Sequence, residues 1–220
     1  MKPHGSVSQR MAWGRYPAIH GLAAVTSLVS LVTMIWPGIG ASALAGGFIP
    51  ASWGGDVSVH QLVPALLTPI TSAFLHGGVL HLVFNLIMLV FCGRQVEAAL
   101  GGRATLILYA IGMYAAALVQ WAAYPASQVP VIGASGAASA IVGAYAAMFT
   151  QQKVTPIGPV SGYMVRVLWL AAAWIGLQLL FGFATGSDQG GGIAIWAHIG
   201  GFLAGLFLAR PLLKRRYRVR

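Results

Sequence analysis

A serine and a histidine, each at the start of an apolar segment, are the residues that most suggest chemistry. Ser135 lies in Gly133-Ala-Ser-Gly136, and His198 lies in Trp196-Ala-His-Ile-Gly-Gly201. A serine hydroxyl becomes a nucleophile when a base takes its proton, and histidine is the most frequent base. Because polar and ionisable groups are costly inside a membrane, their presence there is a functional hypothesis by default. The pair predicts hydrolysis at membrane depth.

The composition indicates a membrane protein with little room for a soluble domain. Of the 220 residues, 58% are hydrophobic and 7% are charged, whereas a soluble domain has about 25% charged residues. A helix needs about 20 apolar residues to cross the hydrocarbon core, so the fourth of the six apolar segments is short. We expect an all-α polytopic membrane protein with six transmembrane helices at about 17–36, 78–98, 103–122, 135–150, 164–183 and 194–212.

The basic residues alternate with stretches that contain none. The net charge is +10, yet residues 37–77, 122–133 and 184–195 hold no lysine or arginine. This alternation is the positive-inside pattern, and it predicts that both termini are cytoplasmic. The basic tail Lys214–Arg220 is expected to contact anionic lipid headgroups. No aromatic or basic groove is evident, so we expect no nucleic-acid binding. The single cysteine, Cys92, excludes a disulfide within the chain.

The chain divides into three parts: a cytoplasmic N-terminal segment (1–16), a membrane domain (17–212) and a basic cytoplasmic tail (213–220). Two connections stand out within the membrane domain. Residues 37–77 are rich in glycine and proline and still apolar, which predicts a functional loop packed on the outer membrane face. Residues 184–193 are rich in glycine and predict a mobile loop. Without a transit-like extension, the sequence favours a prokaryotic plasma membrane; no oligomeric state is predicted.

Three candidate residues are expected at similar depth. At about 1.5 Å per residue, Ser135, His198 and His81 lie about 27, 18 and 20 Å from the basic residue that ends each segment. All three therefore fall in the outer half of a core about 30 Å thick. Asn85 is the only asparagine and follows His81 by four residues, on the same helical face. The backbone at Ser135, the His81 imidazole and the Asn85 amide can supply donors to an oxyanion.

Each feature also has a structural interpretation. A Gly-Ala-Ser-Gly stretch is commonly a packing surface, because small residues let membrane helices approach closely. The pair His81 and Asn85 can simply bridge two helices. Gly201 and Gly205 form a small-xxx-small pattern, which we expect to bring segment 194–212 close enough to segment 135–150 for His198 to reach Ser135.

These motifs together resemble the rhomboid family of intramembrane serine proteases. The matching stretches are His76-Gly-Gly-Val-Leu-His81-Leu-Val-Phe-Asn85, Gly133-Ala-Ser135-Gly, and Ala197-His198-Ile-Gly-Gly201-Phe-Leu-Ala-Gly205. The resemblance implies a Ser135–His198 dyad, with an oxyanion site formed by the Ser135 N–H, His81 and Asn85. It implies a water-filled cavity open to the outer face and no metal or cofactor.

The resemblance also implies a class of substrate. Substrates would be single-span membrane proteins, cut near the outer membrane face where small or helix-breaking residues unwind their helix. Segment 164–183 and the loop 184–193 would form the gate and cap of the site.

The sequence departs from the family at two places. Members often carry a Trp-Arg pair where this chain has Leu67 and Thr68, and some carry an aromatic residue where it has Ser139. Asp188 is a candidate to orient His198 as the third member of a triad, although the family works as a dyad.

Three functions remain open at this point. The first is an active intramembrane serine protease, and the second is a non-catalytic rhomboid-like protein that binds membrane clients. The third is a transporter or metal carrier that uses His76, His81 and His198 as ligands.

Overall fold

A computed structural model describes residues 16–55, 61–149, 154–185 and 194–218, with the backbone alone described at 177–185 and 218. The expected loop at 184–193, and with it Asp188, falls almost entirely outside the described residues. In the described part of the chain every element is helical, apart from two isolated bridges, Phe48 with Val131 and Ile157 with Val160.

Six long helices correspond to the six apolar segments, and an all-helical membrane bundle is confirmed. Apolar stretches of this kind form helices in lipid because a helix satisfies all its backbone hydrogen bonds within one segment. The six are α1 (Pro17–Thr33), α5 (Val79–Leu100), α6 (Gly102–Ala123), α7 (Ser135–Phe149), α8 (Gly162–Thr185) and α9 (Ile195–Arg218).

Among the described residues, four stretches are long and apolar enough to cross a membrane. α7 and α8 each border residues or side chains that are not described, and the apolar stretch described in each is shorter. The spans are Pro17–Gly46, Val79–Leu100, Gly102–Ala123 and Ile195–Tyr217; the shorter apolar stretches are Ser135–Phe149 and Gly162–Gly176. The described part of α7 has 15 residues, which is about 22 Å at about 1.5 Å per residue. It begins at Ser135, where the fourth apolar segment was expected to begin; because residues 150–153 lie outside the described residues, the short length of the fourth helix stays a prediction.

The described part of the connection 37–77 contains short helices where a loop was expected. After α1 the chain forms a π-helical turn, η2 (Met34–Gly38), with extended backbone at Trp36, and then four short helices. Two of them are rich in alanine and leucine, which favour helix, and the other two have proline in their first turn, where its fixed φ suits a helix start. The four are α2 (Ile39–Gly46), α3 (Pro50–Trp53), η3 (Ala65–Leu67) and α4 (Thr68–Ser72).

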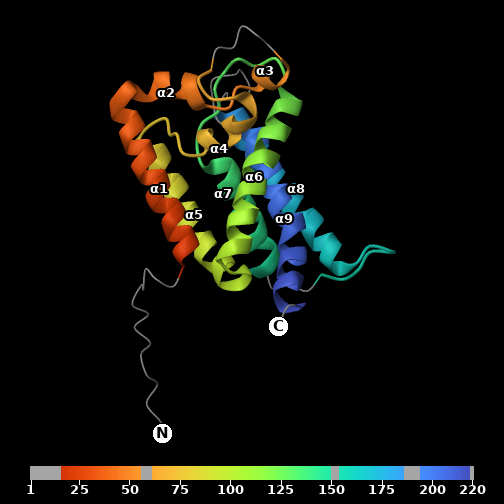
Figure 1. The fold of residues 1–220 in the computed structure, drawn as a ribbon. Helices are drawn as coiled ribbons and strands as arrows, with labels where there is room; N and C mark the ends of the chain where they lie inside the picture. Colours follow the sequence, from red (N-terminus) through yellow and green to blue (C-terminus); the bar gives the residue numbers. More distant parts are fainter. Residues whose placement is uncertain (1–15, 56–60, 150–153, 186–193, 219–220) are drawn as a thin grey trace.

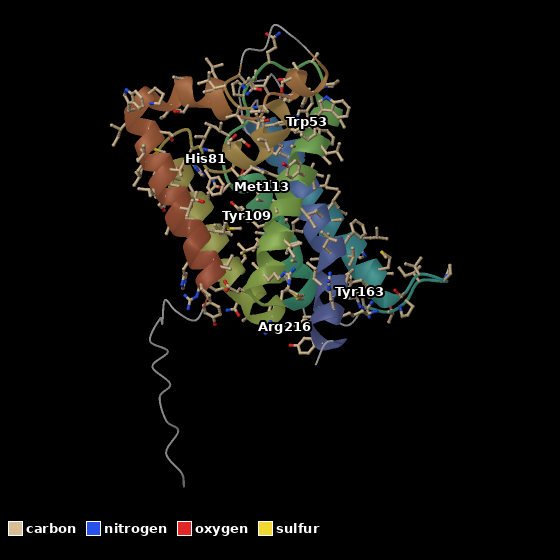
Figure 2. The ribbon with its side chains drawn as sticks, viewed as in Figure 1. Trp53, His81, Tyr109, Met113, Tyr163 and Arg216 are labelled. Carbon is tan, nitrogen blue, oxygen red and sulfur yellow. The ribbon has the colours of Figure 1, made fainter. Side chains whose placement is uncertain are left out.

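Figure 1 shows how these elements are arranged. The start of α1 and the end of α9 lie at the same end of the bundle, and α2, α3 and α4 lie at the opposite end. Arginines gather at the former end: Arg216 donates to the Ala98 carbonyl, and Arg210 lies over the Tyr163 ring. Figure 2 places His81 toward the end with Trp53, and Tyr163 and Arg216 toward the other. His81 is thus well separated from Arg210 and Arg216 along the bundle.

The bundle is organised around α7, whose most extensive contact is with α9. Glycines make this contact possible. A Cβ on Gly201 would overlap the carbonyl oxygen of Gly136, and a Cβ on Gly205 would overlap that of Ala140. Gly143 of α7 lies equally close to the backbone of α9 at Phe202. The predicted close approach at Gly201 and Gly205 is confirmed.

The first helix is fastened to the bundle by a buried carboxylate. Glu97, which is 5% exposed, accepts backbone N–H groups of Ala18 at 3.1 Å and Ile19 at 2.9 Å. These are donors that the first turn of a helix leaves without intrahelical partners, and a negative charge there is favoured by the helix dipole. Ile19, fully buried, also packs against Gly93 of α5. This end of α1 is therefore fixed against α5.

The last helix is longer than expected. It continues through Pro211 to Arg218, whereas the apolar segment ends near 212. Leucine, lysine and arginine are all good helix formers, so the end of the apolar segment does not end the helix.

Replacing Gly205 with alanine tests the α7–α9 contact. The new methyl group would meet the Ala140 carbonyl, and overpacking of this kind costs about 1–3 kcal/mol. We expect a lower unfolding temperature in detergent. The control is Gly21→Ala, because nothing lies within 4 Å of that position on α1. A Gly205→Ala variant as stable as Gly21→Ala would contradict the contact.

Candidate active site

Ser135 and His198 lie in direct contact at the starts of two helices. The Oγ of Ser135 is 2.8 Å from Nε2 of His198, and the bond is partly buried. Ser135 is the first residue of α7, and His198 lies in the first turn of α9. The α7–α9 packing is what brings them within reach. In this arrangement the imidazole can accept the hydroxyl proton, which makes serine a nucleophile.

The segment before Ser135 is held by hydrogen bonds to distant parts of the chain. Val131 pairs with Phe48 in both directions, at 2.7 and 2.9 Å. The N–H of Gly133 donates to the Ser72 carbonyl at 2.9 Å, and the N–H of Ala134 donates to Nε2 of His76 at 3.3 Å. The elements after α1 thus fix the backbone that presents Ser135.

Gly133 allows His81 to approach Ser135. Its φ is +122°, and a Cβ there would lie 2.8 Å from Cε1 and 2.9 Å from Nε2 of the His81 ring. The same position is 3.6 Å from Oγ of Ser135. Residues with a side chain rarely adopt this φ. A glycine is required here by both the backbone angle and the imidazole, and the ring of His81 borders the serine.

The protonation of His81 follows from its neighbour Gly77. The N–H of Gly77 donates to Nδ1 of His81 at 3.3 Å. A neutral imidazole has one donor and one acceptor, so its proton lies on Nε2. That N–H is on the side of the ring that faces Gly133 and Ser135. His81 is therefore a hydrogen-bond donor toward the site.

Asn85 lies one turn after His81 and is 6% exposed. Its amide nitrogen donates to the His81 carbonyl at 2.9 Å. A primary amide has a second N–H, which remains for a bound group. The structure thus brings Ser135, His198 and His81 together and places Asn85 on the same helix, with one of its donors used locally.

Three helices begin at this site: α5 at Val79, α7 at Ser135 and α9 at Ile195. The N-terminus of a helix carries unpaired N–H groups and about half a positive charge. Their convergence favours negative charge, such as that on the oxygen of a tetrahedral intermediate.

The structure describes the residues at both places where the sequence departs from the pattern of the motifs. Ser139 is buried, one turn below Ser135, and its Cβ faces Gly201, so the small side chain fits the tight α7–α9 contact. Thr68 is fully buried and bonds the Ala65 carbonyl at 2.6 Å, while Leu67 is half exposed. The Ala65 carbonyl also accepts the indole N–H of Trp53 at 2.9 Å. This shared carbonyl anchors the segment that contains Leu67 and Thr68.

One residue near the site was missed by sequence reasoning. Gln120 of α6 is 8% exposed, and its side-chain oxygen accepts the N–H of Ala197 at 3.2 Å. It thereby caps the helix that carries His198. The available signal was a lone amide near the end of an apolar segment, since such groups in membrane helices are usually functional or paired.

Within the described residues, no cluster of three or more histidine, cysteine, aspartate or glutamate side chains is arranged to hold a metal ion. The rings of His76 and His81 are 5.0 Å apart, but one nitrogen of each ring accepts a backbone amide, and the other nitrogen of His76 bonds the Ser30 hydroxyl. The metal-carrier hypothesis gains no support from this geometry.

The sequence of this chain matches the Rhomboid domain over residues 64–215, well over half of its length. The chain belongs to the rhomboid family. This rhomboid is 32% identical over 146 residues to RHOMBOID-like protein 5 of Arabidopsis thaliana, covering 66% of the chain and 44% of that relative. It is 32% identical over 148 residues to the rhomboid protease GluP of Bacillus subtilis (strain 168), covering 67% of the chain and 25% of that relative. The chain thus spans less than half the length of these curated relatives.

Substituting Gly133 with alanine tests the contact between this loop and His81. We expect a loss of stability from the positive φ, about 1–3 kcal/mol, and a further loss from the clash with the ring. Gly38→Ala is the matched control, because its φ is +101° and nothing lies within 4 Å. Unfolding temperatures measure both. If Gly133→Ala and Gly38→Ala lose the same amount of stability, the His81 ring does not contact Gly133.

Proposed function

We propose that this rhomboid is an intramembrane serine endopeptidase, with Ser135 as nucleophile and His198 as general base. The observation that carries the proposal is the 2.8 Å contact between Ser135 Oγ and His198 Nε2. A family that includes a named protease adds support. The contact lies where apolar helices begin, so its substrate is a peptide bond in or near a membrane-spanning segment.

The geometry supports a two-step mechanism. As Ser135 Oγ attacks the peptide carbonyl carbon, its proton passes to His198 Nε2, and the carbonyl oxygen becomes negative. The Nε2–H of His81, an amide N–H of Asn85 and the backbone N–H of Ser135 stabilise this oxygen. The imidazolium then gives its proton to the leaving amine. Water, activated by His198 in the same way, hydrolyses the acyl-enzyme and restores the serine.

The substrates we propose are single-span membrane proteins, approached through the surrounding lipid. A transmembrane helix must unwind to expose a peptide bond, because its carbonyls are otherwise in helical hydrogen bonds. No cofactor or metal enters the mechanism. The site lies opposite the basic end of the bundle, which supports a topology with both termini cytoplasmic and the site toward the outer face of a prokaryotic plasma membrane.

A non-catalytic, client-binding rhomboid is the second candidate. The observation that favours it is Ser139, a small buried residue at a position where some members of the family carry an aromatic one. Such a protein would bind the same membrane clients without cleaving them.

Cleavage of a single-span reporter in lipid or detergent separates the two. We expect wild type to cleave it, and Ser135→Ala and His198→Ala each to reduce the rate by about 10³-fold or more. Ser139→Ala is the control, as it removes a neighbouring buried serine hydroxyl and should retain most activity. Helical content and unfolding temperature confirm that each variant folds. Reporter binding without cleavage by wild type would favour the client-binding protein, and cleavage by Ser135→Ala would refute the dyad.

A further inference from the structure

His76 has no part in the proposed dyad, yet it connects three distant segments of the chain. It lies between α4 and α5 and is 2% exposed. Its Nδ1 is 2.8 Å from Oγ of Ser30 on α1, and its Nε2 is 3.3 Å from the N of Ala134. Ala134, which is fully buried, immediately precedes Ser135.

The protons of this chain of hydrogen bonds can be assigned. A backbone N–H can only donate, so Nε2 of His76 is the acceptor for Ala134 and carries no proton. The proton of the neutral ring is therefore on Nδ1, and it is donated to Ser30 Oγ. The Ser30 hydroxyl in turn donates to the Phe74 carbonyl at 2.8 Å. Every donor has one acceptor, and the arrangement admits one tautomer of His76.

This arrangement requires His76 to be neutral. A proton on Nε2 would face the N–H of Ala134, leaving two donors opposed in a buried place. Burial, and to a smaller extent the nearby His81, lower the pKa of His76 to about 4, against an opposing effect of the Phe74 backbone. The ring is thus neutral at neutral pH.

We propose that His76 is a positioning residue for the nucleophile, acting through the Ala134 amide and held in one tautomer by Ser30. This inference rests on the proposed protease function. The next residue after Ala134 bears the hydroxyl that must lie 2.8 Å from His198. When residue 76 offers no acceptor, the buried N–H of Ala134 is unsatisfied, and the segment before Ser135 shifts until this N–H finds another partner. A displacement of about 1 Å of a reacting group costs about 10²-fold in rate.

The same chain gives α1 a role at the site. Its first turn is fixed by Glu97 and its later turns carry Ser30. Because both contacts are buried, the helix holds His76 from the side opposite Ala134. An element remote from the dyad thereby sets the position of Ser135.

Four variants separate positioning from a merely structural role. His76→Gln can still accept from Ala134 and donate toward Ser30, whereas His76→Leu can do neither. We expect His76→Leu to lower kcat by about 10²-fold with little change in KM, and His76→Gln to restore most of it. Ser30→Ala should lower kcat less than His76→Leu, because the acceptor for Ala134 remains. Ser27→Ala is the control on α1, since its hydroxyl donates to the Ala23 carbonyl of the same helix; it should match wild type.

A second measurement does not depend on catalysis. In protein with ¹⁵N-labelled histidine rings, the His76 signals are assigned by their loss in His76→Gln. We expect a protonated Nδ1 and an unprotonated Nε2. A protonated Nε2, or a His76→Gln variant as impaired as His76→Leu, would overturn the inference. If wild type cleaves no reporter, the proposed protease function is refuted instead. The ¹⁵N measurement of the His76 tautomer would then still show whether His76 accepts the Ala134 amide.

Discussion

The close backbone contact between α7 and α9 is the constraint on which the site depends. Lipid tails are as apolar as the helices, so burying apolar side chains does little to bring membrane helices together. Small residues do so instead, by letting the backbones touch. Gly201 and Gly205 place α9 directly on the carbonyls of α7. Because Ser135 and His198 lie one turn from this contact, the hydrogen bond between them follows from the helix packing.

The remaining parts of the site come from the segments that precede α5 and α7. Gly133, with its positive φ, admits the His81 ring beside the serine, and Gly77 fixes which nitrogen of that ring is a donor. His76 takes the opposite tautomer because its own amide partner is on the other nitrogen. Two histidines of one short motif are thus set to different protonation patterns by backbone N–H groups, without any carboxylate.

Much of this architecture could be predicted from the sequence. Apart from the end of α9, the apolar segments predicted the described bounds of the long helices to within a few residues, since length and hydropathy are strong signals in a membrane. The Gly201 and Gly205 spacing predicted the α7–α9 contact, and the depth estimate brought Ser135, His198 and His81 to one level. These predictions succeeded because each depends on periodicity along a single helix or on distance from a membrane boundary.

Other features depend on contacts between distant residues, which no local pattern contains. Residues 37–77 were expected to form a loop. The described part of this segment contains four short helices, and Trp53 and Thr68 both bond the Ala65 carbonyl. Gln120 and Ser30 are ordinary polar residues in apolar helices until Ala197 and His76 are placed beside them. The end of α9 was missed because helix propensity continues past the apolar segment.

The most direct test of the central claim is covalent labelling of the serine. A fluorophosphonate reacts with a serine that an adjacent base has activated, so intact mass and peptide mapping report the Ser135–His198 contact without a chosen substrate. We predict a single adduct on Ser135 in wild type and no adduct in a folded His198→Ala variant. Equal labelling of the two proteins, or an adduct on another residue alone, would contradict the account.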